Sequence, residues 1–563
     1  MTLAHSWLLI LIAPFVSAVV LMRPGTRPSA WVAAACLSVI PAAILAMTAP
    51  SSFLPNFLWP GAQLGVTQLG RGWLAFTAVL WGAAAVYAVH SVPPGLRNSG
   101  RFWLLWMTAC SGNLLLIISL DAISFYVGFS MMSLAAYALV VHDGTPTARR
   151  GGRLYLQLAI LGEVLLLAGI IVQVEYSGSP QFTAWVTEGV SPWAVAPLIC
   201  GLGLKAGFWP LHVWLPLAHP VAPAPASAVL SGAMIKAGIL GIWAFLPPSE
   251  LLAFWSPWLM TTGLISALFG VIAGLARSNV KQTLAYSSVS QMGYLLFIVA
   301  AGWQLPDERL LVGSALLVYV IHHGFAKGAL FLTADLMKTH RLPDGRKRWG
   351  LAALIALPAL ALCGLPATSG AAAKTLLKGL LDSPALSAWV VWLQLGTLAT
   401  TLLLARVLWL FYRDQQRAPV RAIAPLQSWP WALLCVMGLG SAWLWPTMQT
   451  PLFYALELAT VFDAIWPIAA GLLIAAAALH WRWRVPAVVY DTRHPFERWS
   501  VRFRRRLNKP ILPEIETPWL HESHKLLRRI ERRWNRMLQG PTVNRSAALM
   551  IVFILLAATL IVL

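Results

Sequence analysis

About sixteen apolar runs, each near the length that crosses a lipid bilayer, constrain this chain more than any other feature. A transmembrane helix needs roughly 20 apolar residues, because an α-helix rises about 1.5 Å per residue and the hydrocarbon core is about 30 Å thick. Of the 563 residues, 58% are hydrophobic and only 11% are charged. The sequence therefore predicts an all-α polytopic membrane protein with about sixteen transmembrane helices. The predicted spans cover residues 4–22, 29–48, 71–92, 102–120, 122–141, 154–174, 192–211, 224–247, 253–276, 280–301, 311–337, 350–378, 385–412, 429–447, 461–480 and 546–563.

Basic residues occupy every second loop between these runs. The formal net charge of +21 is by itself compatible with nucleic-acid binding. Alternation of basic loops with neutral or acidic loops is instead typical of membrane proteins, which keep lysine and arginine on the cytoplasmic side. We therefore expect no nucleic-acid partner, and a bacterial cytoplasmic (inner) membrane protein with both termini on the non-cytoplasmic side. The predicted cytoplasmic loops contain Arg23 and Arg27, Arg97 and Arg101, residues 149–153, Arg277 and Lys281, residues 338–348 and residues 413–421.

The cysteines give no sign of a cofactor. Cys36, Cys110, Cys200, Cys363 and Cys435 are scattered singly through apolar runs, without a C-x-x-C pair. This spacing argues against iron–sulfur ligation and against a disulfide framework. No glycine-rich dinucleotide fingerprint or P-loop follows a strand-like segment either. We expect no cofactor, no metal and no catalytic centre in the chain itself.

Ionisable residues inside the predicted spans are the strongest functional candidates. A charge at the centre of a bilayer costs at least about 2.5–3.5 kcal/mol on insertion scales, so each needs a partner or water. Such residues commonly mark ion pathways and proton relays. The candidates are Glu163, Lys205, Lys236, His322, His323, Lys327, Lys374, Lys378 and Arg406.

Spacing strengthens this interpretation in the span at 311–337. Tyr319, His323 and Lys327 are four residues apart, so they lie on one helical face. Imidazole titrates near neutral pH, and such a stack can relay protons. The alternative for His323 is a satisfied hydrogen bond between helices. His322 points about 100° away on the helix, where a structural role is favoured.

Five prolines follow Lys205 within twenty residues: Pro210, Pro216, Pro220, Pro223 and Pro225. Proline breaks a continuous helix, so the span should end just past Lys205 and the next should begin after Pro225. Broken helices in membranes persist only where they line protein or a hydrated cavity, which places Lys205 where water can reach it. His219 is expected at the surface of a tight cytoplasmic loop.

Three stretches carry a family resemblance: "LKAGFWPLHVWLPLAHPVAPAPASAVLSGAMIKAGILG" from Leu204, "VKQTLAYSSVSQMGYLLF" at 280–297 and "IHHGFAKGALFL" at 321–332. They resemble the antiporter-like subunits of respiratory complex I, Mrp cation/proton antiporters and membrane-bound hydrogenases. The resemblance extends over about residues 100 to 410. Within that superfamily, the first stretch is most similar to the large membrane subunit of formate hydrogenlyase-type (group 4 hydrogenase) complexes.

The resemblance implies an inverted repeat of five helices, each copy containing one broken helix. Lys205 matches the broken-helix lysine of the first half and Lys374 that of the second. Lys236 matches a bridging lysine, and His323 and Lys327 match the central pair, so that together they form a hydrophilic axis along the membrane plane. The expected parts are 1–100 (N-terminal helices), 101–248 (first half), 249–413 (second half), 414–480 (additional helices), 481–545 (a basic amphipathic segment at the cytoplasmic face) and 546–563 (a last span).

One departure from the family pattern concerns Lys205. The family usually has a glutamate in the fifth span, which pairs with the broken-helix lysine. The matching stretch here is "FSMMSLAAY" at 129–137, with Ser130 at the position of that glutamate. Two hypotheses follow: either Glu163 on the next span takes over the pairing, or the proton route is lost or changed.

The function implied is that of a proton-translocating membrane subunit in a multisubunit energy-converting redox complex, hydrogenase-like or complex I-like. Its expected partners are other membrane subunits, peripheral redox subunits, the lipid bilayer and protons, or sodium in their place. An Mrp-type cation/proton antiporter subunit is one alternative. A membrane partner that supplies proton flow to a soluble enzyme, as in inorganic-carbon uptake, is another, and an inert scaffold is disfavoured by the buried lysines.

Overall fold

The computed structural model describes residues 3–481, apart from positions 24, 26, 49–50, 54–58, 60, 96–97, 344, 385 and 445. Within these ranges, eleven helices are long and apolar enough to cross a membrane, and shorter apolar helices accompany them. The prediction of an all-α polytopic membrane protein is confirmed. The predicted basic segment at 481–545 and the predicted span at 546–563 lie, but for the first residue, outside the described residues.

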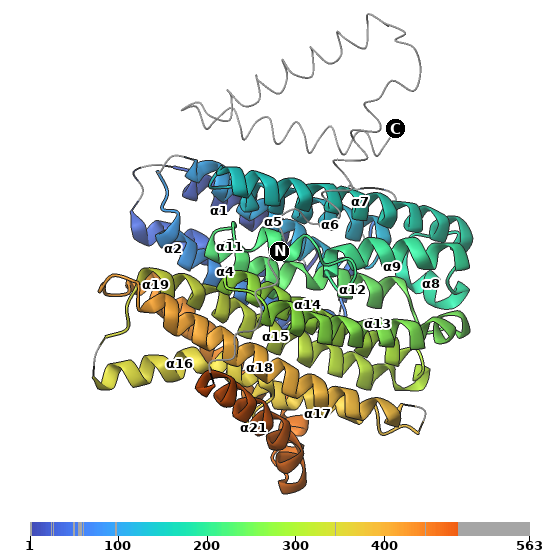
Figure 1. Ribbon diagram of the computed structural model, residues 1–563. Coiled ribbons are helices and arrows are strands. Elements are labelled where there is room, and N and C mark those ends of the chain that lie inside the picture. Colours follow the sequence, from blue (N-terminus) through green and yellow to red (C-terminus); the bar gives the residue numbers. More distant parts are fainter. Residues whose placement is uncertain are drawn as a thin grey trace, which may run out of the picture. The chain divides into compact units, whose positions relative to one another are not determined.

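Helices make up most of the described chain (Figure 1), and one antiparallel pair of three-residue strands accompanies them. The elements are α1 (Leu3–Leu21), α2 (Pro28–Leu37), α3 (Ile40–Ala46), β1 (Ser51–Phe53), β2 (Leu64–Val66), α4 (Gln68–Ser91), α5 (Ser99–Ile118), α6 (Ala122–Val140), α7 (Pro146–Ser177), α8 (Phe182–Glu188), α9 (Pro192–Ala206), α10 (Leu215–Ala218), α11 (Ala224–Val229), η1 (Leu230–Met234), α12 (Lys236–Phe245), α13 (Glu250–Leu275), α14 (Val280–Gly302), η2 (Pro306–Glu308), α15 (Arg309–Thr339), α16 (Arg346–Cys363), α17 (Ser369–Gly379), η3 (Ser387–Trp389), α18 (Val390–Gln415), α19 (Pro425–Leu444), α20 (Pro446–Tyr454) and α21 (Leu458–His480).

The centre of the bundle is formed by α14 and α15. Every residue in the most apolar 18-residue window of each of these two spans is buried. Helix α15 packs against α14, α16, α17 and α18, and also against α4, α11 and α19. Since α15 contains His322, His323 and Lys327, all three are buried inside the bundle.

Two successive sets of helices follow the same order. In the first, the hairpin α5–α6 is followed by the long helix α7, an interrupted helix (α9, α10) and α11–α12. In the second, the hairpin α13–α14 is followed by the long helix α15, an interrupted helix (α16, α17) and α18. Because each set crosses the membrane an odd number of times, the second set starts from the opposite side. This order fits the expected inverted repeat with one broken helix in each half.

The helix breaks occur where the prolines predict them. Helix α9 ends at Ala206, directly after Lys205, and α11 begins at Ala224 with Pro225 in its first turn, a position that proline tolerates. One difference concerns the predicted span at 29–48, which is divided into α2 and α3. Pro41 lies in the first turn of α3, so the missing N–H of proline explains the division.

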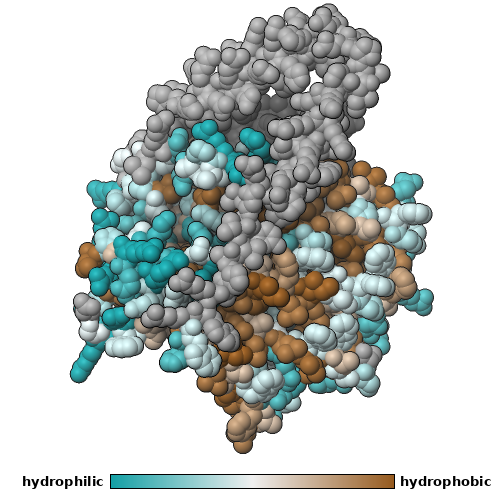
Figure 2. Space-filling model, viewed as in Figure 1, coloured by the Kyte–Doolittle hydropathy of each residue, from teal (hydrophilic) through white to brown (hydrophobic). Residues whose placement is uncertain are grey.

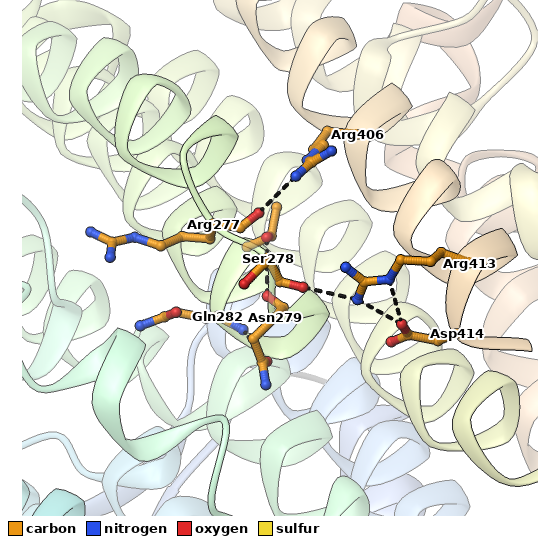
Figure 3. Close-up of polar contacts among 8 residues, drawn as sticks. Arg277, Ser278, Asn279, Gln282, Arg406, Arg413 and Asp414 are labelled. Carbon is orange, nitrogen blue, oxygen red and sulfur yellow. Dashed lines mark hydrogen bonds and ion pairs between the residues drawn. The ribbon is translucent and has the colours of Figure 1, made fainter. Parts of the chain in front are cut away.

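Basic loops far apart in the sequence meet at one face (Figure 3). Arg413 on α18 donates to the backbone oxygen of Ser278 at 2.9 Å, and Arg406 donates to that of Arg277 at 3.3 Å. The loop after α15 joins the same region, because the backbone N–H of Arg341 donates to the oxygen of Pro419 at 3.0 Å. Three predicted cytoplasmic loops therefore lie together, as an alternating charge pattern requires.

Large apolar side chains cover much of the outer surface. Figure 2 shows apolar residues gathered over the middle of the visible face, with hydrophilic residues beside them. Phe462 and Trp466 on α21 and Trp392 on α18 are among the exposed ones. Such a surface suits lipid or the membrane helices of another subunit.

Helices α13 and α14 cross at close range. A Cβ atom added at Gly263 would lie 2.6 Å from the backbone oxygen of Gly293 and 3.2 Å from the backbone nitrogen of Phe297. Small residues at such crossings let two helix backbones approach each other. This crossing fixes α14, whose Leu284 backbone oxygen accepts from the Lys327 ammonium.

We predict that Gly263→Ala destabilises the protein, because the added methyl group meets backbone atoms that cannot move independently of their helix. Overpacking of this kind costs about 1–3 kcal/mol. A lower melting temperature of the detergent-purified protein should report the loss. Gly350→Ala is the matched control, because a Cβ atom there meets nothing within 4 Å. Equal melting temperatures for the two variants would contradict the prediction.

Candidate functional site

Lys205 lies in the last turn of α9, where the helix is interrupted. Gly207 adopts a φ of +71° and its N–H donates to the oxygen of Gly203 at 2.8 Å, which closes the helix. The indole N–H of Trp214, beyond the break, donates to the oxygen of Leu204 at 2.7 Å. Backbone oxygens at the helix break are therefore hydrogen-bonded by other groups of the chain, and the Lys205 ammonium is available for other contacts.

Neutral hydroxyl groups accept hydrogen bonds from the Lys205 ammonium. Its Nζ lies 2.9 Å from Oγ of Ser133 and 3.4 Å from Oη of Tyr155, and 5.7 Å from the ring centroid of Phe129. A cavity of about 10 Å³ adjoins these groups, which is about the space of one water molecule. Ser133 lies one turn after Ser130 on α6, so a neighbouring serine takes the place of the usual carboxylate partner.

Glu163 on α7 lies near this group without forming a contact ion pair. In the described part of the chain, no carboxylate oxygen lies within 4.0 Å of the Lys205 ammonium. Glu163 nevertheless interacts electrostatically with Lys205, Tyr126 and Tyr155. Its side chain is 8% exposed, and Oε1 has no hydrogen-bond partner among the described residues. A buried carboxylate oxygen without a donor is costly, which marks Glu163 as a functional candidate.

Lys236 donates to backbone oxygens in an irregular, π-helical turn. The π-helical turn η1 directly precedes it, and Lys236 Nζ donates to the oxygens of Ser231 at 2.9 Å and Gly232 at 2.6 Å. A π-helical turn shifts the usual i to i−4 bonding and so frees acceptors. The side chain is fully buried.

Lys327 is connected to Lys236 by two serines. Its Nζ donates to the backbone oxygen of Leu284 at 2.9 Å, and Oγ of Ser288 donates to the same oxygen at 3.1 Å. Oγ of Ser288 lies 2.8 Å from Oγ of Ser231, whose backbone oxygen accepts from Lys236. This serine bridge, formed by Ser231 and Ser288, was not predicted. The run "SSVS" in an otherwise apolar span is the sequence signal that could have found it.

The two histidines of α15 have different surroundings. His323 is fully buried, and neither of its ring nitrogens has a hydrogen-bond partner among the described residues. His322 Nδ1 lies 2.9 Å from Oγ of Ser369, in the first turn of α17. The expected structural bond of His322 is therefore present, and it connects α15 to the helix that carries Lys374.

Lys374 lies just after the second interruption, which mirrors the position of Lys205 before the first. Gly364 ends α16 with a φ of +83°, and Thr368 caps α17 by accepting from the N–H of Ala371 at 3.3 Å. Lys374 Nζ turns back to the oxygen of Cys363 at 2.6 Å and to Oγ1 of Thr397 at 2.9 Å. A cation at the carbonyl end of α16 is favourable because that end carries partial negative charge.

The basic groups from Lys236 to Lys374 interact with one another inside the bundle, and Lys205 lies apart from them beside Glu163. Lys236 interacts electrostatically with Lys327 and with both His322 and His323. His322 interacts in turn with Lys374. Of the candidates predicted from the sequence, the structure thus brings Lys236, His323, Lys327 and Lys374 together, and joins Glu163 to Lys205 at the other end.

His219 corrects an expectation. It is fully buried rather than at a loop surface, and its ring is stacked on that of Phe331 with a centroid distance of 4.4 Å. Its neighbours include Lys281 and Lys327, with which it interacts electrostatically. The reason is that the segment after α9 folds back into the bundle as α10, which packs on α14 and α7. His219 therefore joins the candidate residues.

Comparison with known proteins identifies the family to which the chain belongs. The profile of the family described as NADH:quinone oxidoreductase/Mrp antiporter, transmembrane, matches residues 119–402, just over half of the chain. The chain belongs to this family. The matched region includes every candidate residue from Glu163 to Lys374, while α19, α20 and α21 lie beyond it.

Two relatives illustrate the range of complexes in the family. The chain is 31% identical over 348 residues to hydrogenase-4 component B of Escherichia coli K12, which covers 58% of this chain and 52% of the relative. It is 29% identical over 391 residues to NADH-quinone oxidoreductase subunit N of Desulforudis audaxviator, covering 65% and 75%. The chain thus spans about half the length of the first of these relatives. The family is one of membrane subunits of multisubunit complexes.

Solved structures share the fold. The Mrp complex from Dietzia sp. gives a TM-score of 0.69 at 21% identity, with 100% of this chain and 63% of that chain covered. The archaeal membrane-bound sulfane sulfur reductase gives 0.66 at 17% identity, with 84% and 99% covered. The comparisons support the expected superfamily and fold class.

We predict that Ser288→Ala slows proton movement between Lys327 and Lys236 without unfolding the protein, because it removes the serine bridge while the lysine bonds to backbone oxygens remain. Proton flux into proteoliposomes that hold the native complex, under an imposed membrane potential, should fall several-fold, an effect of roughly 1 kcal/mol. Ser290→Ala is the control, since Ser290 Oγ is buried in the same helix without a partner among the described residues. Equal flux in both variants would remove the serine bridge from the pathway.

Proposed function

We propose that this chain is a proton-translocating membrane subunit of a multisubunit energy-converting redox complex. The observation that carries the proposal is the set of four lysines, Lys205, Lys236, Lys327 and Lys374, in which each ammonium is held by neutral oxygens. An amine held by neutral oxygens exchanges its proton without first breaking a contact ion pair. Buried basic groups in such a series are typical of proton relays in membranes.

The electron-transfer chemistry then belongs to other subunits. No group of three or more His, Cys, Asp or Glu side chains that could hold a metal ion occurs among the residues that the structure describes. The similarity to hydrogenase-4 component B and to NADH-quinone oxidoreductase subunit N supports peripheral redox partners. Conformational or electrostatic change in those partners would reach this chain through its membrane helices.

The proposed location is the bacterial cytoplasmic membrane, with both termini on the non-cytoplasmic side. The meeting of the basic loops around Arg277, Arg413 and Arg341 at one face supports this orientation, because basic loops are retained in the cytoplasm. An Mrp-type cation/proton antiporter subunit is the second candidate, favoured by the fold shared with the Mrp complex. Sodium would then move in exchange for protons.

We predict that Lys205→Met and Lys374→Met each reduce proton flux in the proteoliposome assay by at least about tenfold, equivalent to roughly 1.4 kcal/mol, because each removes one member of the series. Lys338→Met, at the exposed end of α15, is the control and should leave flux unchanged. Normal flux in both test variants, with the complex intact, would overturn the proposed function.

The role of Glu163 has a separate prediction. Glu163→Gln keeps the shape of the side chain but removes its charge, so the electrostatic support of Lys205 is lost. We expect proton flux to fall several-fold, an effect of roughly 1 kcal/mol, and Glu163→Asp to retain part of it. Unchanged flux in Glu163→Gln would mean that Glu163 does not replace the family glutamate.

Purification of the complex from its native membrane separates the two candidate functions. Co-purifying subunits with iron–sulfur centres, identified by mass spectrometry, would support the redox complex. Co-purification of small multi-span membrane subunits alone would favour the Mrp-type antiporter.

A further inference from the structure

Beyond the series of basic groups, the structure contains an ion pair between two membrane helices. Lys378 lies one turn after Lys374 on α17, and its Nζ donates to Oδ2 of Asp463 on α21. Both side chains are about half exposed at the surface of the described residues, at 44% and 49%. Asp463 lies in the second turn of α21, past the position where a carboxylate would cap the helix. Helix capping therefore does not explain why α21 carries the charged Asp463, which is costly in a membrane helix.

A cavity connects this ion pair to Lys374, which is half-buried. Its volume is about 90 Å³, enough for several water molecules and far larger than the cavity of about 10 Å³ beside Lys205. Several of its lining side chains are polar. The lining includes Lys374, Lys378, Asp463, Tyr319, Thr397 and Cys363.

Helix α21 is held in a defined place, so the ion pair is not a chance contact of a loose helix. A Cβ atom added at Gly471 would lie 2.9 Å from Cβ of Thr401 and 3.1 Å from the backbone oxygen of Leu398, so α21 and α18 approach closely there. Asp463 is eight residues earlier on the same helix, slightly more than two turns. Helix α21 lies beyond the region that the family profile matches, so the profile does not include this carboxylate.

Building on the proposed function, we propose that Asp463 is the proton acceptor at the outer end of the series and that its ion pair with Lys378 is the gate of the cavity beside Lys374. The series of basic groups then has a carboxylate at each end, Glu163 beside Lys205 and Asp463 beyond Lys374.

The proposed transfer is balanced at each step. The Lys374 ammonium gives one proton to the cavity water, and the Asp463 carboxylate takes one proton from it, leaving a neutral amine and a neutral carboxylic acid. The neutral acid no longer attracts the Lys378 ammonium, so the gate opens. Asp463 then releases its proton on the exposed side and pairs with Lys378 again, while Lys374 is reprotonated from the central groups.

The single variants distinguish this role from simple anchoring of α21. In the native complex in proteoliposomes, Asp463→Asn should reduce proton flux by at least about tenfold, Asp463→Glu should retain most of it, and Lys378→Gln should leave flux present because the carboxylate remains. An anchoring pair would instead make Asp463→Asn and Lys378→Gln behave alike. That result, or normal flux in Asp463→Asn, would overturn the proposal.

The double variant gives a second test. An amide pair in Asp463→Asn/Lys378→Gln can still form a hydrogen bond, so it restores an anchor but not a proton acceptor. We expect its flux to stay as low as that of Asp463→Asn, and recovery to the wild-type level would overturn the proposal. Lys205→Met is the reference variant. If Lys205→Met blocks proton flux while Asp463→Asn does not, the role proposed for Asp463 is wrong and the proposed function stands. Normal flux in both variants would reject the proposed function.

Labelling of Cys363 measures the gate without any transport. Cys363 is among the residues that line the cavity and is 3% exposed. Iodoacetamide labelling of the intact complex, quantified by peptide mass spectrometry, should be about threefold or more faster in Lys378→Gln, because the closed pair no longer limits access. Glu457→Gln, which changes an exposed residue at the start of the same helix, is the control and should label like wild type. Equal rates in Lys378→Gln and wild type would show that the pair does not close the cavity.

Discussion

An ammonium group in a low-dielectric helix bundle must be hydrogen-bonded, and the rest of this structure depends on how that requirement is met. The backbone provides most of the acceptors. Lys236 uses oxygens released by the π-helical turn before it, Lys374 uses the carbonyl end of α16, and Lys327 uses a carbonyl of α14 that also accepts from a serine. For Lys236 and Lys374, helix irregularity therefore supplies the acceptors, and an apolar residue at either position would leave those carbonyls without the lysine donor.

The chemistry of these acceptors also explains how a relay is compatible with a stable fold. A contact ion pair between buried groups is strongly destabilised when one partner loses its charge. Backbone carbonyls and hydroxyls carry no formal charge, so they accept from an ammonium group and do not repel a neutral amine. Lys205 shows the same principle with side chains, since Ser133 and Tyr155 receive it while Glu163 acts from a greater distance.

The sequence predicted the parts that follow from local physics. Prolines located the break after Lys205, hydrophobic runs located most spans, and the four-residue spacing placed His323 and Lys327 on one buried face of α15. It did not predict contacts that depend on which helices become neighbours. The serine bridge joins η1 to α14. Asp463 on α21 pairs with Lys378 on α17, which lies 85 residues earlier in the chain. His219 was misplaced because a proline-rich segment reads as a surface loop, whereas this one folds into the bundle as α10.

The two ends of the series differ in a way that the family pattern alone does not require. At Lys205 the carboxylate is buried, unpaired and beside a space for about one water molecule. At Lys374 the carboxylate comes from α21, is paired, and borders a cavity of about 90 Å³. A narrow, buried end limits exchange with bulk water, because it has room for only about one water molecule. A hydrated end closed by an ion pair suits exchange with water, because a single protonation removes the attraction that keeps it shut. The two ends therefore differ in burial, in hydration and in the pairing of their carboxylates, and on the proposed function these differences would determine where protons enter and leave.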